Sequence, residues 1–124
     1  MVLLLLLITF VTNDYLIKVQ SQNVAKPLTL WHVEQELIKQ NVKHINIVMK
    51  QIKLETGHLK YVKDFNLFGF TTKKGLMKFK SLEEAVTYKK QWQDKYYRGG
   101  NYYFFLRKIG YAQDSNYIRK LKQI

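Results

Sequence analysis

Apolar residues recur at helical spacing along much of this chain, and the spacing predicts where helices begin and end. The clearest helix runs from about His44 to Thr56, with apolar side chains at i, i+3, i+4 and i+7: Ile45, Val48, Met49 and Ile52. Gly57 follows in the position where a left-handed residue commonly ends a helix. Thr29 is the expected N-cap of an earlier helix that reaches about Gln40, with an apolar stripe of Leu30, Val33, Leu37 and Ile38.

The period changes between residues 66 and 80. Residues 67–71 and 76–79 have the composition of strands, and the Thr72-Lys73-Lys74-Gly75 stretch between them is typical of a turn. A small hairpin is therefore predicted to interrupt the helices.

Three further helices are expected after the hairpin. Ser81 and Glu84 match a capping box that would open a helix reaching about Tyr97, in which Val86, Lys89, Trp92 and Tyr96 share a face. Asn101 is the expected cap of a helix over residues 102–109, and Asp114 or Ser115 the cap of a last helix that turns Tyr117, Ile118 and Leu121 inward. The fold class is mainly α (α+β), with one small β-hairpin lobe.

The N-terminal segment differs in composition from the rest. An apolar run from Val2 to Val11, broken only by Thr9, has the length of a signal-peptide core and is too short to span a bilayer as a helix. No Lys or Arg precedes it, so an uncleaved anchor or a buried segment is the alternative. We therefore divide the chain into residues 1–22, a signal peptide or N-terminal hydrophobic segment, and residues 23–124, the folded domain.

Charge and composition narrow the function only coarsely. Twenty-one Lys and Arg against nine Asp and Glu give a net charge of +12, which favours attraction to a polyanion such as nucleic acid, an anionic membrane or an acidic cell-wall polymer. The absence of cysteine excludes disulfides, thiolate metal sites and cysteine nucleophiles. His32, His44 and His58 have no metal-binding spacing, so neither a metal nor another cofactor is expected.

Glu55 is the most informative single residue. It lies ten positions after Ile45 on the predicted helix, which places it at the edge of the apolar stripe beside Val48. Partial burial and the negative end of the helix dipole both raise the pKa of a carboxyl there. A carboxyl that stays protonated is what a glycosidase uses to protonate the leaving oxygen. The alternative is a surface Glu that pairs with a nearby base such as Lys50 or Lys60.

Three stretches, in this order and spacing, resemble motifs of the bacterial glucosaminidases of glycoside hydrolase family 73. They are residues 52–58 (Ile-Lys-Leu-Glu-Thr-Gly-His), 66–69 (Asn-Leu-Phe-Gly) and 110–117 (Gly-Tyr-Ala-Gln-Asp-Ser-Asn-Tyr). The resemblance covers the chain from about Thr29 onwards. It implies a lysozyme-like helical domain that cleaves the β-1,4 bond between N-acetylglucosamine and N-acetylmuramic acid. Muramidase specificity is the alternative to glucosaminidase specificity.

The same resemblance implies roles for individual residues. Glu55 matches the catalytic general acid, and Tyr111 a tyrosine that faces it and can hydrogen-bond the substrate's N-acetyl group or a water. Asn66, Phe68 and Gly69 match a cleft-lining stretch at the entry to the β-lobe. The alternative is a structural turn with a core Phe, which for Phe68 is an equal interpretation. His58 stands where the family often has a tryptophan, and is the candidate replacement for that substrate contact.

The second catalytic group is left open. Asp64 and Glu83 are the preferred carboxylates, since Glu84 already has a capping role. An inverting mechanism needs a base about 6.5 to 9.5 Å from the acid and a retaining one a nucleophile about 5 to 5.5 Å away, whereas assistance by the substrate's acetamido group needs neither.

The expected partners are peptidoglycan glycan strands and, through charge, anionic cell-wall polymers. Nucleic acid is not expected as a partner. The protein is expected to be a monomer. The protein would act outside the cell, in the periplasm or cell wall, or as a phage lysin. We predict that the basic stretches are solvated faces: Lys73-Lys74, Lys89-Lys90, and the group Arg119, Lys120 and Lys122. Most of the aromatic residues between Tyr88 and Tyr117 are predicted to belong to the core. The rival function is a non-catalytic module that binds wall polymer or nucleic acid through its basic and aromatic residues.

Overall fold

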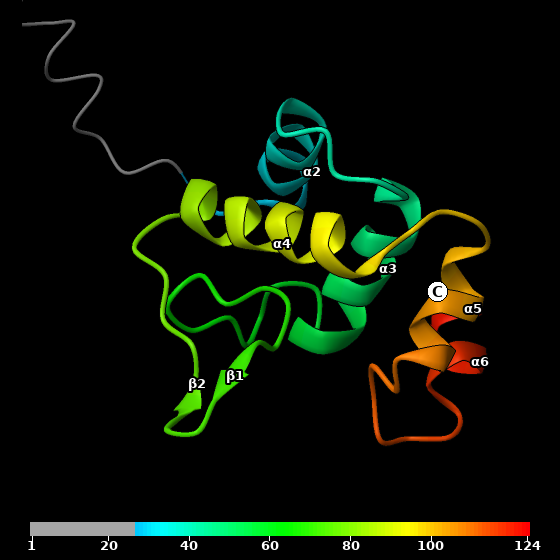
Figure 1. Ribbon diagram of the computed structural model, residues 1–124. Coiled ribbons are helices and arrows are strands. Elements are labelled where there is room, and N and C mark those ends of the chain that lie inside the picture. The colour runs from blue at the N-terminus through cyan, green and yellow to red at the C-terminus, as the bar shows by residue number, and fades with distance from the viewer. Residues whose placement is uncertain (1–26) are drawn as a thin grey trace, which may run out of the picture.

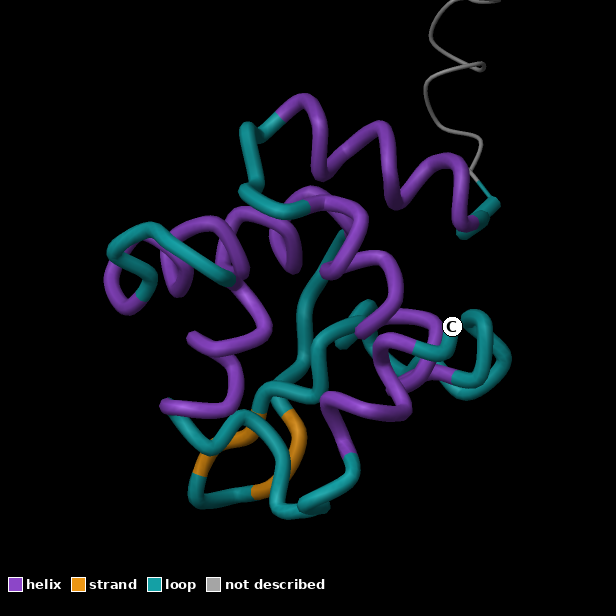
Figure 2. The backbone as a smooth tube through the Cα atoms, turned by 90° about the vertical axis from the view of Figure 1, so that its right-hand side faces the viewer, coloured by secondary structure: helices purple, strands orange, loops and turns teal. Residues whose placement is uncertain are grey.

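The computed structural model describes residues 27–124, so the hydrophobic segment predicted at residues 1–22 lies outside the described part. The described chain forms five helices and one two-stranded hairpin: α2 (Leu30–Lys39), α3 (Ile45–Thr56), β1 (Thr71–Thr72), β2 (Gly75–Leu76), α4 (Leu82–Tyr96), α5 (Tyr102–Lys108) and α6 (Tyr117–Lys122). This confirms a mainly α chain with a small β-hairpin. In Figures 1 and 2, α2 lies at the top of the molecule and the hairpin at the bottom.

Helix α3 is the central element of the fold. It packs against α2 and α6, while α4 packs against α2 and α5 against α6. Val48, Met49 and Ile52 are buried as their spacing predicted, and Ile45 is half-buried. Gly57 ends the helix with φ of 57°, a left-handed conformation that glycine adopts without the steric cost of a Cβ. Among residues 27–124, no helix combines the length and apolarity needed to cross a membrane.

Most of the predicted helix caps are present. The Thr29 hydroxyl accepts from the His32 amide at 3.2 Å, Ser81 Oγ from the Glu84 amide at 3.1 Å, and Asn101 Oδ1 from the Phe104 amide at 2.9 Å. The capping box differs in one detail, because the Glu84 carboxylate accepts from the amide of Lys80 instead of that of Ser81.

The expected cap of the last helix is wrong. Helix α6 starts after Asn116, with no side-chain cap, while Asp114 Oδ1 accepts from the Asn116 amide and forms a turn one step earlier. A second error concerns Ile38, which the predicted stripe placed inside. It is exposed on α2, because the packed face of that helix is narrow and is filled by Val33 and Leu37.

The strands are much shorter than predicted, with only two residues each, paired Thr71 to Leu76 and Thr72 to Gly75. The predicted first strand is instead a buried turn, in which Leu67 and Phe68 contribute to the core. The side chain of Asn66 takes over hydrogen bonds that a longer ladder would have supplied. Its amide donates to the carbonyls of Phe70 at 2.8 Å and Met77 at 3.0 Å, and its oxygen accepts from the Phe70 amide at 3.1 Å.

We expect Asn66→Ala to lower the free energy of unfolding by about 3 kcal/mol, because three hydrogen bonds worth about 1 kcal/mol each are lost around buried groups. Denaturant unfolding measures this change. Asn46→Ala, at an exposed position on α3, is the matched control and should change stability by less than about 0.5 kcal/mol. Equal effects of the two substitutions would show that Asn66 does not hold the hairpin.

Candidate functional site

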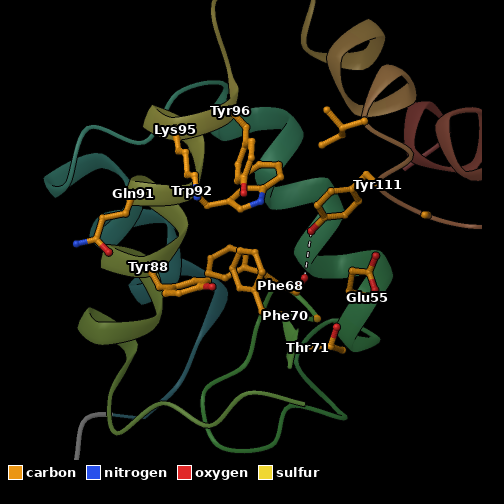
Figure 3. Close-up of a pocket in the computed structure, with 13 residues that line it drawn as sticks. Glu55, Phe68, Phe70, Thr71, Tyr88, Gln91, Trp92, Lys95, Tyr96 and Tyr111 are labelled. Carbon is orange, nitrogen blue, oxygen red and sulfur yellow. Dashed lines mark hydrogen bonds between the residues drawn. The ribbon is translucent and has the colours of Figure 1, made fainter. Parts of the chain in front are cut away.

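A pocket of about 800 Å³ opens between the end of α3, the hairpin and α4 (Figure 3). Four segments of the chain line it. Helix α3 supplies Glu55, the hairpin entry supplies Phe68, Gly69, Phe70 and Thr71, helix α4 supplies Tyr88, Gln91, Trp92, Lys95 and Tyr96, and the segment after α5 supplies Ile109, Tyr111 and Ala112. Glu55 is the only carboxylate among these lining residues.

Glu55 lies in the last turn of α3, and its side chain reaches the wall of the pocket (Figure 3). It is more open to solvent than the sequence predicted, since the residue as a whole is exposed. The protein atoms around the carboxyl nevertheless raise its pKa above the usual 4.5 through partial desolvation. The nearby Tyr117 hydroxyl and the charge of Lys89 act in the opposite direction and lower it. The net direction is upward, which favours a protonated carboxyl.

Gly69 brings the hairpin backbone alongside this carboxyl. Its φ is 66°, and a Cβ built at this position would lie 3.5 Å from Oε2 of Glu55. The left-handed turn is what favours glycine at this position, since a Cβ would only be in ordinary van der Waals contact with the carboxyl.

Tyr111 lies across the pocket wall near Glu55 and Phe68 (Figure 3). Its hydroxyl donates to the Phe68 carbonyl at 3.1 Å, so its proton is already engaged and the lone pairs of Oη remain to accept. Burial raises the pKa of Tyr111 well above 10, and the Tyr117 and Glu55 charges add to this effect. The phenol is therefore neutral, and its Oη offers an acceptor to the pocket.

Aromatic rings form a continuous floor and side wall. Phe70 contacts Tyr88 edge-on at 4.8 Å between ring centroids, and Trp92 contacts Phe70, Tyr96 and Tyr111 at 6.2, 5.8 and 5.9 Å. The sequence assigned most of these rings to the core. Residues 88, 92 and 96 repeat every four positions along one face of a helix. This spacing shows that the rings share a face, but it fits a core stripe as well as a pocket wall.

Lys89 lies directly behind this aromatic floor. Its side chain is 0% exposed, and its Nζ has no hydrogen-bond partner among the described residues. The prediction that Lys89 belongs to a solvated face is wrong, because position 89 shares the buried face of α4 with Ala85, Val86 and Gln93. Desolvation lowers the pKa of Lys89 from 10.5 to about 7, although the Glu55 carboxylate raises it in part.

The structure does not bring the remaining predicted site residues to the pocket. Asn66 is buried, and its side chain is used up by the hairpin backbone, so its expected role in lining the cleft is wrong. His58 is exposed just after α3 and does not line the pocket. Asp64 and Glu83, the candidates for a second carboxylate, are exposed and are absent from the lining as well, because Asp64 lies in the turn before the hairpin and Glu83 points away on the first turn of α4.

No three His, Asp or Glu side chains of residues 27–124 gather closely enough to form a metal site. Comparison of the chain with family models, curated proteins and solved structures found no match.

The burial of Lys89 predicts an unusual pH dependence of stability. Below about pH 7 the ammonium is charged in both states, and the folded state bears the full cost of burying it. Between about pH 7 and 10.5 only the unfolded chain holds the proton, so stability rises with pH across this window. We expect Lys89→Met to be more stable than the wild type at pH 6, and the difference to narrow by pH 10.

Thermal unfolding of both proteins from pH 6 to 10 measures this difference. Lys90→Met is the matched control, since Lys90 is the next residue along α4 and pairs with Asp94 at 2.9 Å on the surface. A Lys89→Met protein that is less stable at pH 6, or a difference that does not change with pH, would contradict the burial of a charged amine.

Proposed function

We propose that this chain is a lysozyme-like hydrolase that cleaves the β-1,4 bond between N-acetylglucosamine and N-acetylmuramic acid in peptidoglycan, with Glu55 as general acid. The observation that carries the proposal is the meeting of three distant motifs. Glu55, the Phe68-Gly69 pair and Tyr111 come from the three stretches that resemble glucosaminidase motifs, and all of them line one pocket.

The electrostatics of the pocket fit an acid role. Partial desolvation raises the pKa of Glu55, so the carboxyl holds a proton at a higher pH than a free glutamate does. In the reaction this proton passes to the glycosidic oxygen while the bond to the anomeric carbon breaks. The leaving sugar then departs as an alcohol instead of an alkoxide.

The aromatic wall fits a sugar chain as ligand. Tyr88, Trp92 and Tyr96 extend along two turns of α4, a length of about 12 Å, which suits more than one sugar ring. Their faces offer apolar surface for stacking, while Gln91 and Lys95 on the same helix supply polar groups for hydroxyl, amide or carboxylate oxygens. The net charge of +12 supports retention on an anionic wall.

The single carboxylate favours one of the three mechanisms. Inverting and retaining enzymes of the usual kind take their base or nucleophile from a second carboxylate, and none of the lining residues besides Glu55 supplies one. In substrate assistance the acetamido oxygen attacks the anomeric carbon as Glu55 protonates the leaving oxygen. Water then opens the cyclic intermediate and returns a proton to Glu55. Tyr111 Oη, free to accept, suits the acetamido N–H.

The proposal places the protein outside the cell or at the cell wall, where its substrate is. The rival is a binding module without activity, for which the basic surface and the aromatic wall would suffice. That function gives no use to a carboxyl with a raised pKa in the pocket.

We expect purified protein to release new N-acetylglucosamine reducing ends from peptidoglycan, and Glu55→Gln to reduce the rate roughly 10²- to 10⁴-fold, the usual contribution of a general acid. Asp64→Asn and Glu83→Gln remove carboxylates outside the pocket and should keep near wild-type rates. Analysis of the released ends by mass spectrometry measures the reaction. N-acetylmuramic acid ends would make the protein a muramidase, and binding to the wall without new ends from any variant would establish the rival function.

A second expectation concerns pH. Because Glu55 must be protonated to act, kcat/KM should be constant at low pH and fall as pH rises through the raised pKa of Glu55, at a pH above 4.5. A short soluble glycan as substrate keeps wall charge out of the measurement. The residual rate of Glu55→Gln should lack this decline. A kcat/KM that instead rises over this range would require Glu55 to act as a base.

A further inference from the structure

Lys89 is surrounded by the rings that line the pocket. Its Nζ lies 4.2 Å from the ring centroid of Trp92, 5.2 Å from that of Tyr111, 5.4 Å from Phe68 and 5.8 Å from Phe70. All four of these residues also line the pocket, whereas Lys89 itself does not. The amine is thus separated from a bound ligand by a single layer of aromatic side chains.

Packing alone gives no reason for an ammonium at this place. A buried cation without a hydrogen-bond partner opposes folding, and the ring faces compensate it only in part. A methionine has a similar length and would fill the same space without a charge. The amine therefore adds a positive charge, which methionine lacks, and this charge attracts the four surrounding rings through cation–π interactions.

Glu55 lines the same pocket as the four rings that surround Lys89, so the aromatic layer lies between the amine and the space that the carboxyl borders. The Lys89 ammonium favours the ionised form of the Glu55 carboxyl, and the carboxylate in turn favours the ammonium. Delivery of the proton from Glu55 leaves a carboxylate in the pocket. A fixed cation behind the aromatic layer stabilises this state and so assists the transfer.

We infer that Lys89 is a positioning residue of the pocket. Its buried ammonium holds the four surrounding rings, those of Phe68, Phe70, Trp92 and Tyr111, in their positions along the pocket wall. The same charge stabilises the carboxylate formed on Glu55. The inference rests on the proposed function for its catalytic part. Its electrostatic part, the coupling of Lys89 to Glu55, is independent of activity.

The coupling is tested on the wild-type protein by following the Glu55 carboxyl carbon by NMR from pH 3 to 9. We expect two steps, the titration of Glu55 itself and a smaller second step at about pH 7, where Lys89 loses its proton. Tyr111, the other titratable group that faces Lys89, stays neutral throughout this range because of its raised pKa. A single step would overturn the coupling.

Lys89→Met and the matched surface variant Lys90→Met complete the test. In Lys89→Met the pKa of Glu55 should rise, and the kcat for wall hydrolysis should fall between about tenfold and a hundredfold, as for a misplaced catalytic group. Lys90→Met should match the wild type in both. A Lys89→Met protein with unchanged Glu55 titration and unchanged kcat would overturn the inference. If the wild type hydrolyses nothing, the proposed function fails, and the titration still decides whether Lys89 acts on Glu55.

Discussion

The packing of α3 between α2 and α6 is the constraint on which the remaining structure depends. Val48 and Ile52 on this helix are fully buried, and Gln51 donates from its buried amide to the Tyr117 hydroxyl at 3.2 Å, which ties α3 to the C-terminal helix. With the helix fixed on both sides, its last turn has one possible place. That place is the pocket wall, where Glu55 meets the hairpin backbone on one side and Tyr111 on the other.

The sequence predicted the helices well, because their signals are local. Each signal lies within a few residues of the helix it predicts. These signals are the caps at Thr29, Ser81 and Asn101 and the apolar spacing of α3. The hairpin was predicted in kind but not in extent, since the length of its strands depends on the Asn66 side chain. That side chain replaces ladder bonds with contacts to Phe70 and Met77, and nothing in the alternation of apolar residues indicates this use.

The site was harder to predict, because it depends on contacts between segments that are far apart in the sequence. Of the residues that the sequence named for the site, the fold brings Glu55, Phe68, Gly69 and Tyr111 together at the pocket. It leaves out His58, Asp64, Asn66 and Glu83. The wall formed by α4 was missed because an aromatic residue at helical spacing has the same pattern whether it faces a core or a pocket. Lys89 was misjudged because a lysine in a run of charged residues is usually solvated; only the position of α4 relative to the hairpin and α5 shows that it is enclosed.

Different elements supply the candidate acid and the aromatic wall of the pocket, and this separation affects which substitutions the protein can tolerate. The candidate acid and the backbone beside it belong to α3 and the hairpin, where the core and the Asn66 hydrogen bonds fix every position. The aromatic and polar wall belongs to one face of α4, and the adjoining face of that helix, with Ala85, Val86 and Gln93, is buried in the core. Positions such as 91, 95 and 96 are exposed and carry little of the fold. On the proposed function, substitutions there can change which ligand is preferred while the candidate acid and the scaffold stay intact, so ligand preference and acid chemistry can evolve separately.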